Sequence, residues 1–340
     1  MPLAPTDSAV LDRLAATYVL PLRSDAPVGD DLAPYLARLS YLIDDLIMVD
    51  GSPEAVFAVH AEAFGRFGRH LQPETVTPMG KVGNVLTGLQ HARHERVVIA
   101  DDDVRYTPEA LREVLGRLAG AHVVRPQNVF RPLPWHARWD TGRQLLNRML
   151  GGDWPGTLAV RRSALPHGYR GDVMFENLEL VRTVLAGGGR EHVAYDVFVE
   201  RRPPTAHHFW SQRVRQAYDE WARPERLVVQ LAVLPAVAAL AARGRWRMLG
   251  AGVAGIAALA EAGRRRGGGR RVYGPTAPLW APLWTAERAV TSWLAVGERL
   301  LRGGVAYRGG RLARAATPLR TLRRLHGARP APEAGPRHAG

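Results

Sequence analysis

The chain of 340 residues contains no cysteine and a single lysine, Lys81. Without cysteine, disulfide bonds, thiolate metal sites and a cysteine nucleophile are all excluded. Residues 1–5 lack a basic segment followed by an apolar run, so we expect no secretory signal and a protein that works on the cytoplasmic side of the membrane. No apolar run reaches the roughly 20 residues that a membrane-spanning helix needs.

Positive charge is concentrated in the C-terminal third of the chain. The formal net charge is +14, and residues 243–340 hold 19 arginines and four glutamates, so the preceding part is close to neutral. The arginine clusters flank apolar runs and tryptophans, and no nucleic-acid-binding motif is present. We therefore expect an anionic membrane surface as the partner of this region, and no nucleic acid.

Apolar periodicity predicts alternating strands and helices. Short apolar runs typical of strands lie at 18–22, 46–49, 97–100, 123–126, 157–162 and 195–199, and helical spacing is found at 32–42, 54–67, 85–94 and 175–186. Strands that alternate with helices of this length are typical of βαβ units. The sequence thus predicts an α/β protein with a mostly parallel sheet flanked by helices, and 46% hydrophobic residues are ample for its core.

Three consecutive acids, Asp101, Asp102 and Asp103, follow the apolar run 97–100. A buried strand of this kind presents its carboxyl end at the edge where open α/β sheets bind ligands. Because the three charges repel one another, we expect a cation there, and oxygen ligands favour Mg²⁺ or Mn²⁺ bridging to a substrate diphosphate. The alternative is an acidic turn before a helix, since Thr107 and Pro108 form a typical helix start.

The order of these and other short motifs resembles family 2 glycosyltransferases, which are inverting enzymes with a GT-A-type nucleotide-sugar fold. The matching pieces span about residues 17–218, and their order makes the match specific. They are the strand at Pro21 with Asp25, Val49-Asp50-Gly51-Ser52, Gly80-Lys81 with Asn84 and Gly88, the acidic triplet, Gly156 to Arg162, the helix at Glu176, and Gln212-Arg213-Val214-Arg215.

The resemblance implies a site residue by residue. Asp50 corresponds to the acid that contacts the nucleotide base, and Asp101 and Asp103 to the pair at the diphosphate and metal. The residues implied in nucleotide-sugar binding are Asp25, Asp50, Lys81, Asp101, Asp102, Gln212, Arg213 and Arg215, and those implied in metal binding are Asp101, Asp103 and His207. Lys81 has a physical reason to be retained, because a compact ammonium suits a diphosphate; its alternative is a surface loop without function.

The general base is the point at which the chain departs from the family. Members usually show Glu-Asp at the start of the helix after the acceptor loop, whereas here Asn177 follows Glu176. Because asparagine takes no proton, the resemblance implies Glu176 as the catalytic base, with Asp172 or Glu179 as substitutes; a glutamate at a helix start also simply complements the helix dipole. Gln216 replaces the tryptophan of processive members, which argues against polymerisation.

The C-terminal third predicts membrane association. Apolar runs at 227–242 and 248–262 are short and flanked by arginine on both sides, so we expect a helical hairpin that dips into the cytoplasmic leaflet, with two short transmembrane helices or a soluble helical cap as alternatives. The predicted organisation is a catalytic domain at 1–226, the hairpin at 227–271, a tryptophan-rich amphipathic helix region at 272–312 with its tryptophans at the headgroup level, and a basic disordered tail at 313–340.

Three functions are compatible with these features. The leading hypothesis is transfer of a sugar from a nucleotide-diphosphate sugar to a hydroxyl of a lipid-like acceptor at the cytoplasmic face of the cell membrane. A sugar-phosphate nucleotidyltransferase would use the same sheet, but such enzymes typically have a glycine-rich loop after the first strand, and residues 23–27 contain no glycine. A non-catalytic scaffold is the third, because Asn177 and Gln216 depart from the family pattern.

Overall fold

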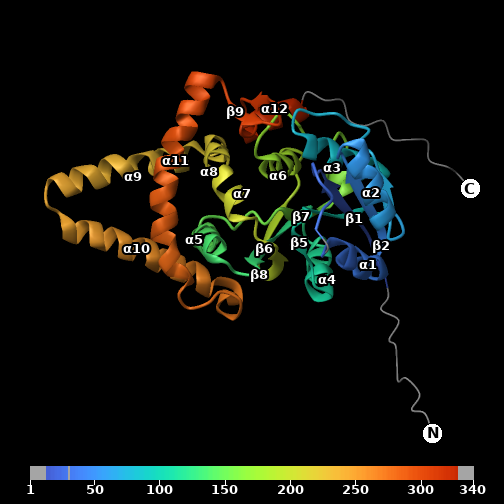
Figure 1. Ribbon diagram of the computed structural model, residues 1–340, viewed down its shortest axis with the longest axis horizontal. Coiled ribbons are helices and arrows are strands. Elements are labelled where there is room, and N and C mark those ends of the chain that lie inside the picture. The colour runs from blue at the N-terminus through green and yellow to red at the C-terminus, as the bar shows by residue number, and fades with distance from the viewer. Residues whose placement is uncertain (1–12, 30, 328–340) are drawn as a thin grey trace, which may run out of the picture.

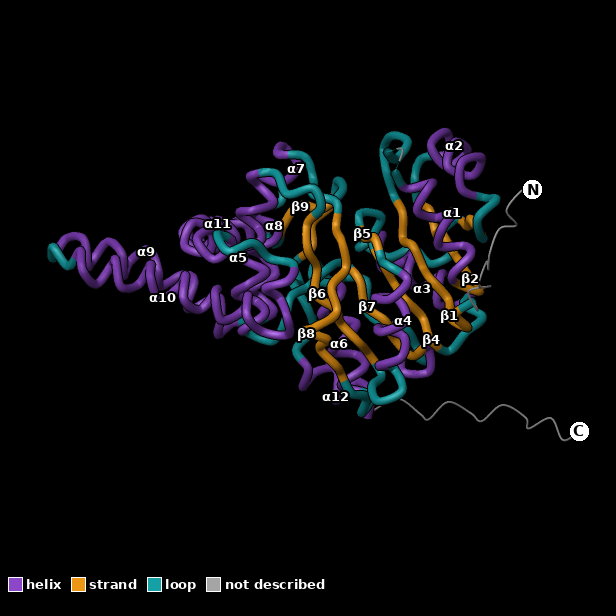
Figure 2. The backbone as a smooth tube through the Cα atoms, turned by 90° about the horizontal axis from the view of Figure 1, so that it is seen from below, coloured by secondary structure: helices purple, strands orange, loops and turns teal. Residues whose placement is uncertain are grey.

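The structure, a computed structural model, describes residues 13–29 and 31–327. Its centre is an eight-stranded sheet in the order β3-β2-β1-β4-β7-β6-β8-β5 (Figure 2). The strands are β1 (Leu14–Leu22), β2 (Ile43–Asp50), β3 (Arg69–Leu71), β4 (Arg96–Ala100), β5 (Val104–Arg105), β6 (Val123–Phe130), β7 (Thr157–Arg161) and β8 (Glu191–Arg201). The pairs of β1 with β2 and β4, of β2 with β3 and of β6 with β8 are parallel. Strand β7 pairs antiparallel with β4 and β6, and β5 pairs antiparallel with β8. The predicted α/β class with a mostly parallel sheet is confirmed.

Helices cover both faces of the sheet (Figures 1 and 2). They are α1 (Leu32–Leu42), α2 (Glu54–Phe64), α3 (Gly80–His91), α4 (Pro108–Arg117), α5 (Trp135–Met149), α6 (Glu176–Ala186), α7 (Ala206–Ser211) and α8 (Arg213–Tyr218). Alternate residues of β1 and β4 enter two separate cores, one shared with α1 and α4 and the other with α3 and α6. This alternation is the period of two that a strand buried on both faces requires.

Close contact between α3 and β1 fixes the position of Lys81. A Cβ atom built on Gly88 of α3 would lie 2.3 Å from Cγ1 of Val19, so only glycine permits this approach. The helix begins at Gly80, five residues before the predicted start, and Lys81 therefore occupies its first turn. A cation is unfavourable at a helix N-terminus, which means that other groups must stabilise Lys81 there.

Helix α5 is an element that the sequence pattern did not predict. Its buried face includes the polar side chains of Asp140, Gln144 and Arg148, so the helix lacks the apolar periodicity by which buried helices are recognised. Arg148 donates hydrogen bonds to the backbone oxygens of Gly263 and Tyr195, and Asp140 pairs with Arg143. Polar contacts of this kind position α5 beneath the C-terminal helices.

The C-terminal region forms a long hairpin that projects from the body (Figure 1). It consists of α9 (Pro224–Ala242) and α10 (Trp246–Arg265), and is followed by α11 (Ala281–Arg302) and by the short 3-10 turns η3 (Arg266–Arg271) and η4 (Ala277–Trp280). The domain boundary predicted at residue 226 falls inside α9. Trp284 of α11 is only 5% exposed, because it faces the body of the protein, while Trp293 is 48% exposed; the expectation that Trp284 lies at the membrane headgroups is therefore wrong.

The predicted disorder of the tail from residue 313 is wrong up to residue 327. After the hairpin strands β9 (Val305–Tyr307) and β10 (Gly310–Leu312), the carbonyl oxygens of Arg314 and Ala315 accept hydrogen bonds from the amides of Met174 and Phe175, just before α6. The helix α12 (Leu319–Gly327) follows. Ala315, Ala316 and Leu322 are buried. Composition suggested disorder, but three small apolar contacts suffice to dock the basic segment. Residues 328–340 lie outside the described part of the chain.

Candidate active site

A cavity of about 450 Å³ opens at the carboxyl ends of β1 and β4. Its wall is formed on one side by the sheet edge, with Asp101, Asp102 and Asp103, and on the other by residues of α5, α8, α9 and α11. Gly156 at the start of β7 makes room for the first acid: it has a φ of +70°, and a Cβ there would lie 2.6 Å from Oδ2 of Asp101. The structure thus gathers the acidic triplet at the sheet edge where the sequence predicts a ligand site.

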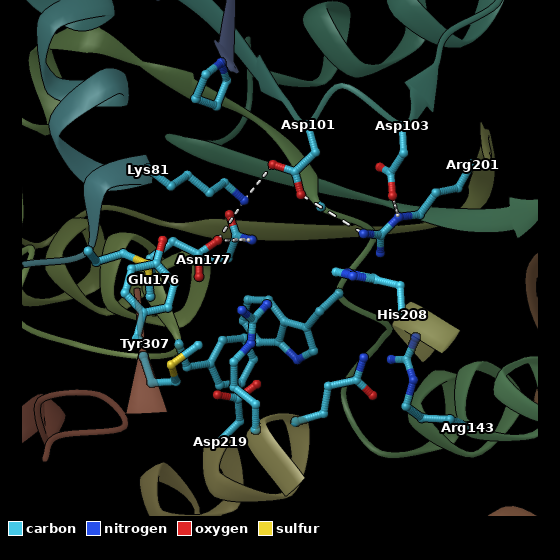
Figure 3. A pocket seen from close by; sticks show the side chains of 18 of the residues that line it. Lys81, Asp101, Asp103, Arg143, Glu176, Asn177, Arg201, His208, Asp219 and Tyr307 are labelled. Carbon is cyan, nitrogen blue, oxygen red and sulfur yellow. Dashed lines mark hydrogen bonds and ion pairs between the residues drawn. The ribbon is translucent and has the colours of Figure 1, made fainter. Parts of the chain in front are cut away.

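Two basic side chains pair with the acids at this edge (Figure 3). Lys81 lies 2.5 Å from Asp101 and 2.7 Å from Glu176, and Arg201 lies 2.7 Å from Asp103. Burial opposes the charge of Lys81, but the carboxylates of Asp101 and Glu176 outweigh it and raise the pKa of the ammonium above its usual value. Arg201 was not singled out in the sequence. It is recognisable only through the register that brings β8 beside β5.

The acids fit a metal ion that is shared with a substrate. In the described residues no group of three or more His, Asp or Glu side chains is arranged to hold a metal by itself. Asp103, however, has a buried Oδ1 without a hydrogen-bond partner in residues 13–29 and 31–327, and Asp101 faces the same cavity. Mg²⁺ is usually held by one or two carboxylates together with substrate phosphates, and Asp101 and Asp103 match that donor set.

Glu176 begins α6 and lines the cavity, whereas its predicted substitutes, Asp172 and Glu179, do not. Its Oε1 accepts hydrogen bonds from Lys81 and, at 2.9 Å, from Nδ2 of Asn177. Asp172 pairs with Arg170 at 2.8 Å and with Arg314 at 2.6 Å, away from the cavity lining. The substitute role predicted for Asp172 is therefore wrong, because its carboxylate is held at the surface by two arginines.

Asp219 is a pocket residue that the sequence analysis missed. It lies in the 3-10 turn η2 (Asp219–Ala222), lines the cavity, and is drawn opposite Asp101 in Figure 3. Burial, together with the charge of Glu176, raises its pKa to about 7. One carboxylate oxygen has no hydrogen-bond partner among the described residues. The only signal in the sequence was its position, because Asp219 follows Arg215 of the Gln212–Arg215 motif by four residues.

Two of the four acids predicted to bind the nucleotide sugar, Asp25 and Asp50, lie outside the cavity lining. Asp50 is 1% exposed, and its carboxylate accepts hydrogen bonds from Nδ1 of His60 at 2.7 Å, from Nε2 of His70 at 3.2 Å and from the amide of Ser52. Burial raises the pKa of Asp50, but these hydrogen bonds outweigh it and hold the pKa at about 2. Asp25 is exposed on the loop after β1, outside the cavity lining. As placed here, neither carboxylate faces the cavity.

The Gln212–Arg215 motif is divided between structural and pocket positions. Arg213 is 2% exposed and is held by Glu287 and Asp140, so it fastens α8 to α11 and α5. Gln212 borders a smaller neighbouring cavity of about 130 Å³. Arg215 lines the main cavity, where its guanidinium lies over the ring of Tyr307. Only Arg215 of the three therefore reaches the main cavity.

The structure brings His208, and not the predicted His207, to the cavity. His207 is exposed on α7 and lies outside the cavity lining, because successive residues of a helix point in different directions. The pKa of His208 is lowered by partial burial and by the nearby Arg215. A neutral imidazole therefore faces the cavity beside Asp103 and Arg201 (Figure 3).

Apolar side chains are exposed along the projecting hairpin. By length and composition α9 is the one helix in the described residues that could cross a membrane, and only 6% of its apolar window is buried. The exposed residues of α9, α10 and α11 are Val228, Val229, Leu234, Val237, Trp246, Met248, Val253, Leu259, Leu283, Val290, Trp293, Leu294, Leu300 and Leu301. We refer to this set as the apolar surface. It exceeds the scattered apolar exposure that soluble monomers show.

Comparison with known proteins identifies the class. Residues 36–167, fewer than half of the chain, match the model of glycosyl transferase family 2. The segment includes Lys81 and the acidic triplet, and the sheet with its flanking helices is GT-A-like. The protein is therefore a glycosyltransferase whose residues 36–167 are of the family 2 type, and the alternatives of a nucleotidyltransferase and a non-catalytic scaffold lose their support.

Solved structures give more distant similarities. A mannosyltransferase from Pyrobaculum calidifontis, solved with GDP-Man and Mn²⁺, is 19% identical over 83% of this chain and 87% of that chain, with a TM-score of 0.48. Glucosyl-3-phosphoglycerate synthase from Mycobacterium tuberculosis, solved with Mn²⁺, UDP and phosphoglyceric acid, is 19% identical over 60% of this chain and 76% of that chain, with a TM-score of 0.39. No curated protein matches the sequence. At these identities and TM-scores no residue role follows.

Proposed function

We propose that the protein transfers a sugar with inversion from a nucleotide-diphosphate sugar to a hydroxyl of a lipid-like acceptor. The observation that carries the proposal is the cavity in which the paired charges of Lys81, Asp101, Asp103 and Arg201 face an acid with a pKa near 7, Asp219. In the reaction the acceptor oxygen bonds to the anomeric carbon, the bond to the diphosphate breaks, and the hydroxyl proton passes to a carboxylate.

The sheet edge is the end of the cavity suited to the donor diphosphate. Asp101 and Asp103 would hold Mg²⁺ or Mn²⁺ against it, and such an ion supplies positive charge that stabilises a departing diphosphate. Lys81 and Arg201 lie against the same acids and provide cationic donors at the same place. When a diphosphate enters, these two side chains can exchange a carboxylate partner for a phosphate oxygen without being desolvated again.

Two acids in the cavity are available to take the proton. Glu176, the base expected from the resemblance, shares its Oε1 with Lys81 and Asn177. Asp219 is the acid whose pKa, about 7, suits general base catalysis at neutral pH. We therefore assign proton abstraction to Asp219, and to Glu176 the holding of Lys81 beside the donor.

The apolar surface supports a membrane location for the acceptor. Arg243, Arg245 and Arg247 lie at the exposed end of the hairpin, where they would meet anionic headgroups. Both helices carry exposed apolar side chains next to this turn. We propose that the hairpin dips into the cytoplasmic leaflet and holds the cavity near the membrane surface, which makes a lipid the accessible acceptor.

Two measurements test the function. Calorimetry on the purified full chain, with a panel of nucleotide sugars and Mn²⁺, should give saturable binding of one donor. Mass spectrometry of lipids from cells with and without the protein should then show one sugar-bearing lipid that is lost with it. If a donor binds but no acceptor and no lipid change is found, the proposed transfer is wrong.

A further inference from the structure

The helical end of the cavity, formed by residues on and beside α9 and α11, carries unpaired positive charge. Arg288 of α11 lines the cavity and is 2% exposed, yet its Nε and Nη1 have no hydrogen-bond partner among the described residues. Buried guanidinium groups are normally paired, because leaving one without partners is costly. The neighbouring Trp284 also has a buried Nε1 without an acceptor in the described chain. These donors all lack an acceptor.

Nearby arginines make the same end of the cavity cationic. Arg223 and Arg226 both line it and share one carboxylate, Glu220, at 2.9 and 3.3 Å. The other acid beside Arg288 is Glu287, which is engaged by Arg213 and Thr291. Burial, and then the charge of Arg213, lowers the pKa of Arg288 to about 10. The local balance is therefore positive, and an anion placed there would relieve it.

The cationic end adjoins the origin of the apolar surface. Helices α9 and α11 cross where Ser292 donates a hydrogen bond to Gln230 at 2.8 Å and Nε1 of Trp293 donates to the carbonyl oxygen of Leu231 at 3.2 Å. Arg288 lies one turn before Ser292, and Arg226 one turn before Gln230, so both arginines sit on the cavity side of this crossing. Exposed apolar residues of both helices begin beside the crossing.

We propose that Arg288, Arg226, Arg223 and Trp284 form a subsite for the phosphate of an anionic lipid acceptor. This inference rests on the proposed function and adds the chemical class of the acceptor, a lipid that carries a phosphate close to its accepting hydroxyl. The phosphate satisfies the free donors of Arg288 and Trp284, and the lipid tail leaves along the apolar surface of α9 and α11. A soluble phosphate ester would use the arginines without needing the apolar surface beside them.

Calorimetry with dodecyl phosphate below its micellar concentration tests the subsite on the full chain. Two comparison ligands are used: inorganic phosphate, which has the charge but no alkyl tail, and dodecyl maltoside, which has the tail but no charge. We expect dodecyl phosphate to bind at least about tenfold more tightly than inorganic phosphate, and Arg288→Gln to weaken that binding by about tenfold or more, as loss of a charge-assisted contact implies. Arg38→Gln, an exposed arginine of α1, is the matched control and should bind like the wild type.

Several results would overturn the proposal. Unchanged dodecyl phosphate binding in both Arg288→Gln and Arg226→Gln would show that the arginines hold no phosphate. Equal affinity for inorganic phosphate and dodecyl phosphate would show that the subsite does not recognise a lipid. A loss of UDP or GDP binding in Arg288→Gln, with dodecyl phosphate binding retained, would assign the arginine to the donor. Failure of the proposed function is separate, because it is judged by donor binding and sugar transfer and not by dodecyl phosphate.

Folding of the variants is checked with Arg288→Met. A structural arginine would lose stability on replacement, whereas a buried and unpaired one should tolerate methionine with an unchanged or higher Tm. We expect Arg288→Met to fold, to keep its Tm, and to lose dodecyl phosphate binding. A Tm that falls while dodecyl phosphate binding persists in the folded fraction would assign Arg288 to the fold instead.

Discussion

At the sheet end of the cavity each cation pairs with a carboxylate, whereas at the helical end Arg288 has no carboxylate partner within the described residues. Lys81 and Arg201 lie among three acids, Asp101, Asp103 and Glu176, so carboxylates outnumber cations at this end before any ligand arrives. At the other end Arg223 and Arg226 share one carboxylate, Glu220. An ion-pair network with excess carboxylate can hold a metal ion and exchange partners with an incoming diphosphate, while an unpaired cation gains most from a new anion. The two ends are therefore suited to two different anionic groups.

Removal of the general base should have the largest effect on kcat, and it distinguishes the two candidate acids. Asp219→Asn is expected to lower kcat by about 10³-fold, within the range for loss of a general base. Glu176→Gln should act mainly on the KM of the donor, through Lys81. If Glu176→Gln lowers kcat by 10³-fold and Asp219→Asn does not, their roles are exchanged. Steady-state kinetics on both variants make the comparison.

The pH profile gives an independent check on the same assignment. Because a general base acts when deprotonated, wild-type kcat should rise as the pH increases through about 7, the pKa of Asp219. That rise should be absent from the residual activity of Asp219→Asn. A rise that persists at the same pH in this variant would exclude Asp219 as the titrating group.

Asp103→Ala tests the sheet end of the cavity. We expect a loss of about 10²-fold or more in kcat/KM, because a carboxylate that places charge at the leaving diphosphate is removed. Asp196→Ala, which removes an exposed ion pair with Arg117, is the matched control and should leave kcat/KM unchanged. Near-wild-type transfer by Asp103→Ala would mean that the donor diphosphate binds elsewhere.

Removing a cation should change the free energy of unfolding differently at the two ends of the cavity. Lys81→Met leaves Asp101 and Glu176 without their shared cation, and we expect a loss of about 1–3 kcal/mol in the free energy of unfolding. Arg288→Met should cost nothing, as argued above. Chemical denaturation of the two variants beside the wild type measures the difference. Equal losses of unfolding free energy in the two variants would show that pairing with carboxylates does not make Lys81 more important for stability than Arg288.

The smallest effect is expected from the surface of the hairpin. Replacing Val229 and Val237, 66% and 44% exposed, by glutamate in one double variant should weaken binding to anionic vesicles about tenfold or more, since each apolar side chain contributes about 1.5 kcal/mol when buried. Val76→Glu is the control, because Val76 is 93% exposed outside the hairpin. Vesicle sedimentation with equal recovery of both variants would contradict membrane contact through this surface.

Local sequence predicted the strand that carries the acidic triplet, because a buried apolar run followed by Asp101 identifies both the strand and its ligand edge. It also predicted the helix at 32–42, which the structure has with the same bounds. It failed for α5, whose buried face is polar, and for the tail up to residue 327, whose docking depends on a few apolar contacts with α6. His207 and Asp172 were misplaced for a similar reason, because side-chain direction and surface pairing are not encoded in a motif.

The sequence by itself determined the class of fold, the acidic edge of the sheet and the basic, apolar character of the C-terminal third. These follow from periodicity and composition, which act over a few residues. Only the tertiary structure decided which charges meet: Arg201 with Asp103, Lys81 with Glu176, and Arg288 with no carboxylate of the part of the chain that the structure describes. Such pairings join residues up to about a hundred positions apart, and they depend on strand register and helix crossing, which local patterns do not specify.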